Sequence, residues 1–148
     1  MKLNNVVVAL DLSDSCAELV EQAKKVSDPK HTKIWLIHVA PPNPDFVGLE
    51  VGPQYIRDNV AEELKEDHRE IQEFAEALRI AGFKAEGLMI QGQEAPVLLG
   101  ELDRLDADLL IIGSHGHGSL YDLFVGSVCK EVLKKSKKPV LTVPTAQL

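Results

Sequence analysis

The chain has 148 residues, of which 45% are hydrophobic, and this predicts a single domain over residues 1–148 with a substantial core. It carries 16 basic and 23 acidic side chains, a formal net charge of -7, which argues against a nucleic acid as partner. The two cysteines, Cys16 and Cys129, lack metal-ligand spacing and do not indicate a disulfide framework. No signal peptide and no membrane-spanning run is recognised, so we expect a cytoplasmic protein without a membrane partner.

Short, mostly apolar segments alternate with segments of helical periodicity. Strands are predicted, in chain order, over residues 6–10, 34–39, 84–90, 109–112 and 140–143, and the third is the weakest of them. Helices are predicted between the strands, because apolar residues recur there every three or four positions. These apolar residues are Leu19, Val20, Ala23 and Val26; Val60, Leu64, Ile71, Phe74, Ala75 and Leu78; Val97, Leu98, Leu102 and Leu105; and Leu120, Leu123, Phe124, Val128, Val132 and Leu133. Gly126 either interrupts or restarts the last helix.

The alternation predicts a doubly wound α/β fold, in which helices cover both faces of a parallel sheet in a three-layer sandwich. Ligands of such sheets bind beyond the carboxyl ends of the strands, where the strand order reverses. With a strand order of 3-2-1-4-5, that crevice lies between strands one and four. Asp11 follows strand one and Gly113 follows strand four, so both are expected to face it.

The connection over residues 41–53 is long for this kind of fold and contains four prolines. Its apolar residues would cover a bound ligand or meet a partner, or they would pack on the surface of their own domain. The sequence leaves both interpretations open.

A glycine-rich loop follows the fourth strand, with the sequence Gly113-Ser114-His115-Gly116, and Gly126-Ser127 precedes the last helix. Glycines let backbone N–H groups approach an anion closely and adopt positive φ. The start of a helix adds unpaired N–H groups and the positive end of the helix dipole. We therefore expect two clusters of donors to face a phosphate.

Three well-known sites do not fit the pattern. A Walker loop would need Lys-Ser/Thr where Ser119-Leu120 stands, and it would follow the first strand. A dinucleotide fingerprint would need glycines in residues 11–15, which contain none. A phospho-acceptor receiver would need an Asp and a Lys at strand ends that carry Gln91 and Thr142.

The remaining pattern is G-2x-G-9x-G-S, formed by Gly113, Gly116, Gly126 and Ser127. Together with Val-Ala-Leu-Asp-Leu-Ser at 8–13, Leu-Ile-His-Val at 36–39 and Lys-Pro-Val-Leu-Thr-Val-Pro at 138–144, it resembles the universal stress protein family over essentially the full chain. The resemblance implies an adenine nucleotide alpha hydrolase-like fold with a five-stranded parallel sheet of order 3-2-1-4-5. It also implies that ATP is the ligand, with AMP and ADP as alternatives and Mg²⁺ at the phosphates.

The matching positions imply which residues hold the nucleotide. The predicted nucleotide-binding residues are Ala9, Leu10, Asp11, Val39, Gly113, Ser114, His115, Gly116, Gly126, Ser127 and Val128. In this assignment Asp11 and Val39 lie at the adenine and ribose, while the glycine loop and the helix start hold the phosphates and ribose through N–H groups and the Ser127 hydroxyl. No catalytic residue and no side-chain metal ligand is assigned.

The expected function is that of an ATP-binding stress-response regulator or sensor. No lysine, arginine finger or water-positioning glutamine accompanies the loop, so hydrolysis is expected to be slow or absent. A weak ATPase or nucleotidyl-transfer enzyme, and a nucleotide-independent dimeric interaction module, are the alternatives. The apolar last strand, 140–143, would be a sheet edge, and both this and the resemblance predict a homodimer through Val140–Val143.

Overall fold

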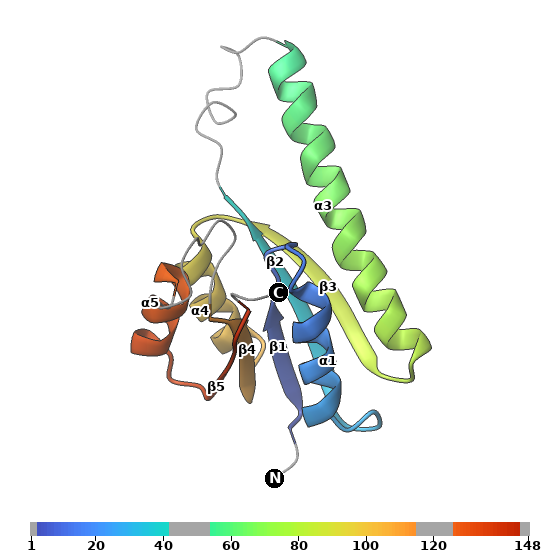
Figure 1. Cartoon of the computed structure of the whole chain (residues 1–148), viewed down its shortest axis with the longest axis vertical. Coiled ribbons are helices and arrows are strands. Elements are labelled where there is room, and N and C mark those ends of the chain that lie inside the picture. Colours follow the sequence, from blue (N-terminus) through green and yellow to red (C-terminus); the bar gives the residue numbers. More distant parts are fainter. Residues whose placement is uncertain (1–2, 42–53, 115–125, 146–148) are drawn as a thin grey trace.

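The computed structural model describes residues 3–41, 54–114 and 126–145, and for residues 54–61 it describes the backbone alone. Strands and helices alternate along the described chain (Figure 1). They are β1 (Asn5–Ala9), α1 (Cys16–Val26), β2 (Lys33–Ala40), α3 (Gln54–Ile80), β3 (Lys84–Gln91), α4 (Glu94–Arg104), β4 (Leu109–Gly113), α5 (Ser127–Lys135) and β5 (Val140–Val143). All five predicted strands are present, with Leu10 falling just beyond the end of β1.

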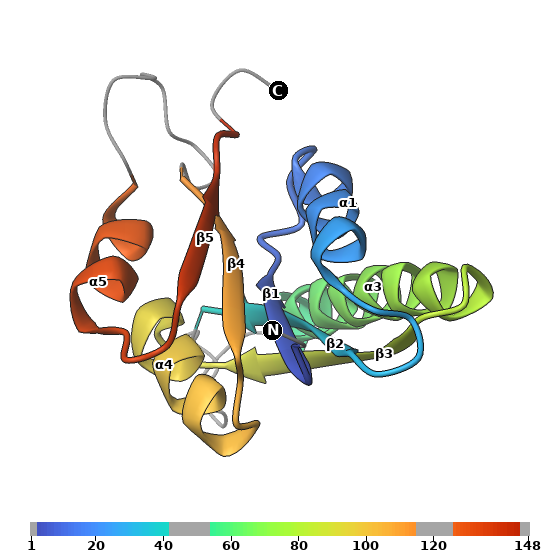
Figure 2. The ribbon, with the colours of Figure 1, turned by 90° about the horizontal axis from the view of Figure 1, so that it is seen from below.

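The five strands form one sheet in the order β3-β2-β1-β4-β5, and every neighbouring pair is parallel. Helices α1 and α3 cover one face of this sheet, and α4 and α5 cover the other (Figure 2). This confirms the predicted doubly wound fold and its 3-2-1-4-5 order.

The continuous apolar run of β1 is explained by a core on both faces of the sheet. Val6 and Val8 pack in the cluster under α1 and α3, while Val7 and Ala9 pack in the cluster under α4 and α5. Each of the three valines is 0% exposed. Because successive side chains of a strand point to opposite faces, both faces need apolar residues.

The packed faces of the helices follow the predicted periodicity, with exceptions at their ends. In α1 the buried residues include Leu19 and Ala23, whereas the predicted core residue Val26 is 36% exposed. Val26 is the last residue of α1, where the helix leaves the sheet. In α5 the predicted Val132 is buried, whereas Leu133, also predicted to pack, is 46% exposed.

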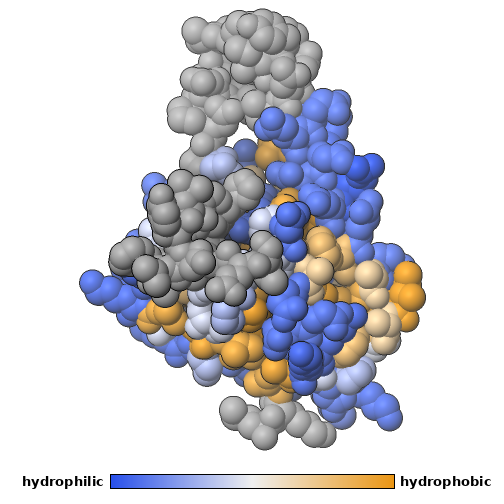
Figure 3. Space-filling model, in the orientation of Figure 1, coloured by the Kyte–Doolittle hydropathy of each residue, from blue (hydrophilic) through white to orange (hydrophobic). Residues whose placement is uncertain are grey.

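Helix α3 is longer than the sheet that it covers, so its N-terminal part extends past the strands (Figure 1). Where Figure 3 draws the upper part of α3 in colour, its surface is hydrophilic. The C-terminal half packs closely on β3, because Gly87 has no side chain: a Cβ at Gly87 would lie 2.5 Å from Cγ2 of Ile71. No helix in the described ranges is long and apolar enough to cross a membrane.

Gly126 immediately precedes α5, which begins at Ser127. Leu120, Leu123 and Phe124 lie outside the described residues, as does 42–53, nearly all of the long connection.

Candidate functional site

A cavity of about 250 Å³ opens at the carboxyl ends of β1 and β4, where the strand order reverses. Five elements and the loops next to them contribute to its wall. The lining residues are Ala9, Asp11, Ser15, Leu19, Glu94, Ile112, Gly113, Gly126, Ser127, Val128 and Cys129. The cavity therefore lies in the crevice that the sheet topology predicts for a ligand.

The start of α5 supplies a wall of hydrogen-bond donors. The first intrahelical hydrogen bond runs from the N–H of Lys130 to the carbonyl of Gly126 over 3.0 Å. Within the described ranges, the N–H groups of Ser127, Val128 and Cys129 have no acceptor, and no side chain caps the helix. These three donors and the positive end of the helix dipole favour an anion in the cavity.

Two of the predicted donors are already used by the protein. The N–H of Gly126 donates to the carbonyl of Ser114 over 2.7 Å, and the N–H of Ser114 donates to the carbonyl of Val143 over 2.8 Å. Each of these N–H groups thus has an acceptor within the protein, whereas the sequence assignment gave the N–H of Gly126 to a phosphate. The donor that the sequence assignment missed is the N–H of Cys129.

Neither of the two glycines of the pattern that the structure describes adopts a positive φ. Gly126 has a φ of -61°, and Gly113 is not among the described glycines with positive φ. A side chain at Gly113 would be crowded, because a Cβ there would lie 3.1 Å from Cγ2 and Oγ1 of Thr145. The tight contact at this glycine therefore comes from the residue after β5 and not from a positive φ.

Asp11 presents its carboxylate from the loop between β1 and α1. Its Oδ1 accepts hydrogen bonds from the N–H of Ser13 at 3.0 Å and from the Ser13 hydroxyl at 2.6 Å. Between them Leu12 adopts a φ of 61°, a left-handed conformation that is rare for leucine. The turn fixes one carboxylate oxygen, and within the described part of the chain Oδ2 has no partner.

Glu94, the first residue of α4, also lines the cavity and was not predicted. Burial raises the pKa of its carboxyl above the ordinary value, the negative charge of Asp11 raises it further, and His38 lowers it. Because a helix that follows a parallel strand begins at the carboxyl edge of the sheet, an acidic residue opening α4 was the signal in the sequence. The cavity thus has two carboxylates as well as three N–H donors.

His38 is held between two elements beside this wall. Its Nδ1 donates to the carbonyl of Leu10 over 2.9 Å, since a carbonyl can only accept, and its Nε2 lies 3.5 Å from Oδ2 of Asp67 on α3. The side chain is buried, and it links the end of β2 to the chain leading into Asp11.

The structure brings together six of the eleven predicted nucleotide-binding residues in the lining of the cavity: Ala9, Asp11, Gly113, Gly126, Ser127 and Val128. Leu10 is not among them, because its side chain is 1% exposed and packs in the core on the opposite face, under α1 and α3. Val39 is buried on the α4 side but does not line the cavity, and Ser114 takes part through its backbone bonds to Gly126 and Val143. His115 and Gly116 lie outside the described residues.

The lining residues missed by the sequence assignment are Ser15, Leu19, Glu94, Ile112 and Cys129. Ser15, Leu19 and Ile112 belong to apolar or helix-start patterns that carry no functional signal by themselves.

The two cysteines near the cavity have unreactive thiols. Burial, with the nearby charge of Asp11, raises the pKa of the Cys16 thiol to about 12, and burial also raises the pKa of Cys129. Both thiols are free and stay protonated at neutral pH. No group of three or more His, Cys, Asp or Glu side chains within residues 3–41, 54–114 and 126–145 could hold a metal ion.

Comparison with known proteins identifies the family. The sequence model of the universal stress protein family matches residues 2–144. The chain belongs to the universal stress protein family. The family assignment agrees with the cavity position, since the matched region includes every residue of its lining.

Individual universal stress proteins share the whole fold. Universal stress protein MJ0577 of Methanocaldococcus jannaschii is 27% identical over 150 residues, covering 93% of each chain. The solved structure of MJ0577 superimposes with a TM-score of 0.82 over 98% of each chain, at 23% identity.

Two other solved structures of the family are complexes with nucleotides. A universal stress protein in complex with cAMP is similar with a TM-score of 0.67 over 98% of this chain and 99% of that one, at 23% identity. The universal stress protein from Archaeoglobus fulgidus in complex with dAMP has a TM-score of 0.63 over 96% of this chain and 98% of that one, at 21% identity.

Proposed function

We propose that this universal stress protein binds ATP in the cavity between β1 and β4 and acts as a nucleotide-dependent regulator or sensor. The proposal rests on one observation: hydrogen-bond donors line one side of the cavity and carboxylate acceptors line another. The unpaired N–H groups of α5 suit phosphate oxygens, and the carboxylates of Asp11 and Glu94 suit the hydroxyl and amino donors of a nucleoside.

The nucleotide complexes of two related proteins support this assignment. One relative was solved with cAMP and another with dAMP, and both share the fold of this chain. Their ligands are adenine nucleotides, which fits an anion site next to acceptors for a nucleoside.

Mg²⁺ fits the proposal as a companion of the phosphates rather than as a resident of the protein. Mg²⁺ is commonly bound by one or two carboxylates together with substrate phosphates and water. In this proposal the phosphates and water hold Mg²⁺ and no side chain is assigned to it, because Asp11 is assigned to the nucleoside.

The cavity favours binding over turnover. None of its described lining residues is a lysine or an arginine, and phosphoryl transfer depends on such groups to stabilise the developing charge. We therefore propose that hydrolysis is slow or absent, and that occupancy itself is the signal.

We further propose that the protein forms a homodimer through Val140–Val143. Strand β5 is an outer strand of the sheet, and three of its four residues are only partly buried. Pairing with a second copy would cover this edge.

The function is tested by titrating ATP into nucleotide-free protein in a calorimeter, for the wild type and for Asp11→Ala. We expect saturable binding that Asp11→Ala weakens at least about tenfold, the effect of losing a charged hydrogen-bonding partner. Absence of ATP binding to the wild type would contradict the proposal. Phosphate release faster than about 1 per second would show an enzyme instead.

A further inference from the structure

Two acidic residues of α4, Glu94 and Glu101, differ in their partners. Glu101, on the same helix, forms an ion pair with Arg104 at 2.7 Å, whereas no hydrogen bond or ion pair is made by Glu94 within the described ranges. Glu94 is half-buried and lines the cavity. A carboxylate partly removed from water without a partner is costly, so this acceptor is available to a ligand.

The position of Glu94 in the layer defines which part of a ligand it reaches. Helices α4 and α5 lie on the same face of the sheet, and their first residues both border the cavity. A phosphate at the start of α5 leaves the nucleoside half of the ligand to extend toward β1 and α4. Glu94 therefore lies on the nucleoside side, together with Asp11.

We propose that Glu94 is a specificity-determining residue of the nucleotide site. Its carboxylate accepts a hydrogen bond from a donor on the nucleoside, either a ribose hydroxyl or the exocyclic amino group of the base. This inference rests on the proposed function and adds to it the chemistry by which the site selects among nucleotides. A ligand that lacks the donor leaves the carboxylate unpaired and binds more weakly.

The charges around Glu94 favour a neutral hydrogen-bond donor of the ligand next to its carboxylate over an anionic group of the ligand. Asp11 lines the same cavity and raises the pKa of Glu94, as does burial. His38 acts in the opposite direction, but its two ring nitrogens face the Leu10 carbonyl and Asp67. A donor from the ligand would satisfy Glu94 without adding negative charge to the pair.

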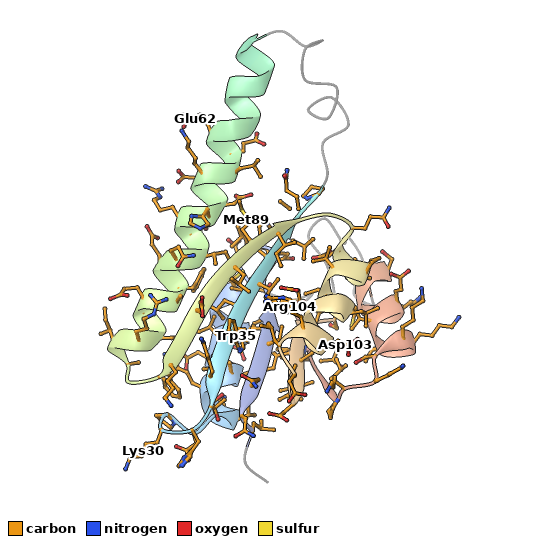
Figure 4. The ribbon with its side chains drawn as sticks, turned by 180° about the vertical axis from the view of Figure 1, so that it is seen from behind. Lys30, Trp35, Glu62, Met89, Asp103 and Arg104 are labelled. Carbon is orange, nitrogen blue, oxygen red and sulfur yellow. The ribbon has the colours of Figure 1, made fainter. Side chains whose placement is uncertain are left out.

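The test compares four ligands in calorimetric titrations: ATP, 2′-deoxyATP, 3′-deoxyATP and purine riboside triphosphate, which lacks the amino group. Each is titrated into the wild type, Glu94→Ala and the control Asp103→Ala. Asp103 is an exposed acidic residue at the other end of α4 (Figure 4). Thermal melting of each variant verifies that it is folded.

We expect the wild type to bind at least one analogue about tenfold more weakly than ATP, and Glu94→Ala to bind ATP and that analogue equally. The analogue affected identifies the donor as a hydroxyl or as the amino group. Asp103→Ala should keep the preference of the wild type. If Glu94→Ala is poorly folded, Glu94→Gln, which keeps one acceptor oxygen, should show a reduced preference.

Three results would overturn the inference. Glu94→Ala could weaken all four ligands equally, or none of them, or its effect could vanish in EDTA, which would place it at a metal ion. Failure of the proposed function gives a different result, because the wild type would then bind none of the four ligands.

Discussion

The amide of Gly126 donates to the carbonyl of Ser114 over 2.7 Å, and this bond joins the start of α5 to the end of β4. It uses an N–H that the glycine pattern assigned to phosphate. Among the described residues, the first N–H of α5 without an acceptor is consequently that of Ser127, and we propose that the anion binds at the first turn of α5. Gly126 serves the site by fixing where the helix begins.

The first prediction concerns Ser127→Pro, which removes one of the three N–H groups of α5 that have no acceptor among the described residues. Proline is well tolerated at the first position of a helix, and Gly126 has a ψ of 154°, which a following proline accepts. We expect normal folding but a loss in ATP affinity of about tenfold or more, because a hydrogen bond to a charged phosphate is lost. Calorimetric titration measures the affinity.

Ser127→Ala is the matched control, since it keeps the N–H and removes only the hydroxyl. Its loss in affinity should be smaller than that of Ser127→Pro. Equal affinities for Ser127→Pro and wild type would place the phosphates elsewhere.

The second prediction is a pH dependence of stability caused by Glu94. Its pKa in the folded state is raised, so the folded protein holds the proton more tightly than the unfolded chain. The contribution is present at low pH and is lost as pH rises through this raised pKa. Glu94→Gln should therefore gain in melting temperature over the ligand-free wild type as pH rises from about 4 to about 8. A difference that stays constant across this range would rule out the explanation.

The third prediction tests the contact between α3 and β3. In Gly87→Ala the new methyl group would lie 2.5 Å from Cγ2 and 3.2 Å from the carbonyl oxygen of Ile71. We expect a loss of about 1 to 3 kcal/mol in the free energy of unfolding, as for other overpacked sites. Urea denaturation measures it.

Gly100→Ala provides the contrast, because nothing lies within 4 Å of the position of its Cβ in the interior of α4. That variant should gain about 0.5 to 1 kcal/mol from helix propensity. Similar changes in both variants would show that the close approach of α3 is not the cause.

The fourth prediction addresses the proposed dimer through the outer edge of β5. The carbonyls of Pro139 and Val143 accept from β4, so in a parallel pair Thr142 directs its N–H away from β4. Thr142→Pro removes this outward donor and leaves the pairing with β4 intact. Sedimentation velocity should show a dimer for the wild type and a monomer for this variant. A wild-type monomer at all concentrations, or an unaffected dimer, would argue against the interface.

Much of the fold could be predicted because a parallel strand that is buried on both faces has a continuously apolar sequence. The run containing Val6, Val7 and Val8 is apolar throughout, since alternate side chains enter opposite cores. The same pattern failed at Val26 and Leu133, where a helix turns its apolar residue to solvent near its end. Periodicity indicates the buried face of a helix but not where the helix leaves the sheet.

The site was predicted less completely than the fold, because its donors and acceptors depend on tertiary contacts. The glycine pattern identified the correct edge of the sheet, yet which N–H groups stay free depends on the bond between Ser114 and Gly126. Glu94 could not be recognised by spacing, since its role depends on α4 starting beside the loop that carries Asp11. Likewise the crowding at Gly113 comes from Thr145, which follows the neighbouring strand β5.

Leu12 occupies a conformation that costs a residue with a side chain about 1 to 2 kcal/mol, next to the carboxylate of Asp11. A glycine would relieve this strain, but it would also let the turn sample many other shapes before a ligand arrives. Leu12 and the two Ser13 hydrogen bonds to Asp11 hold the carboxylate in one position. Ligand binding then requires little ordering of this loop. The conformation of Leu12 lowers the stability of the folded state, and the preorganised loop lowers the entropy cost of the proposed binding.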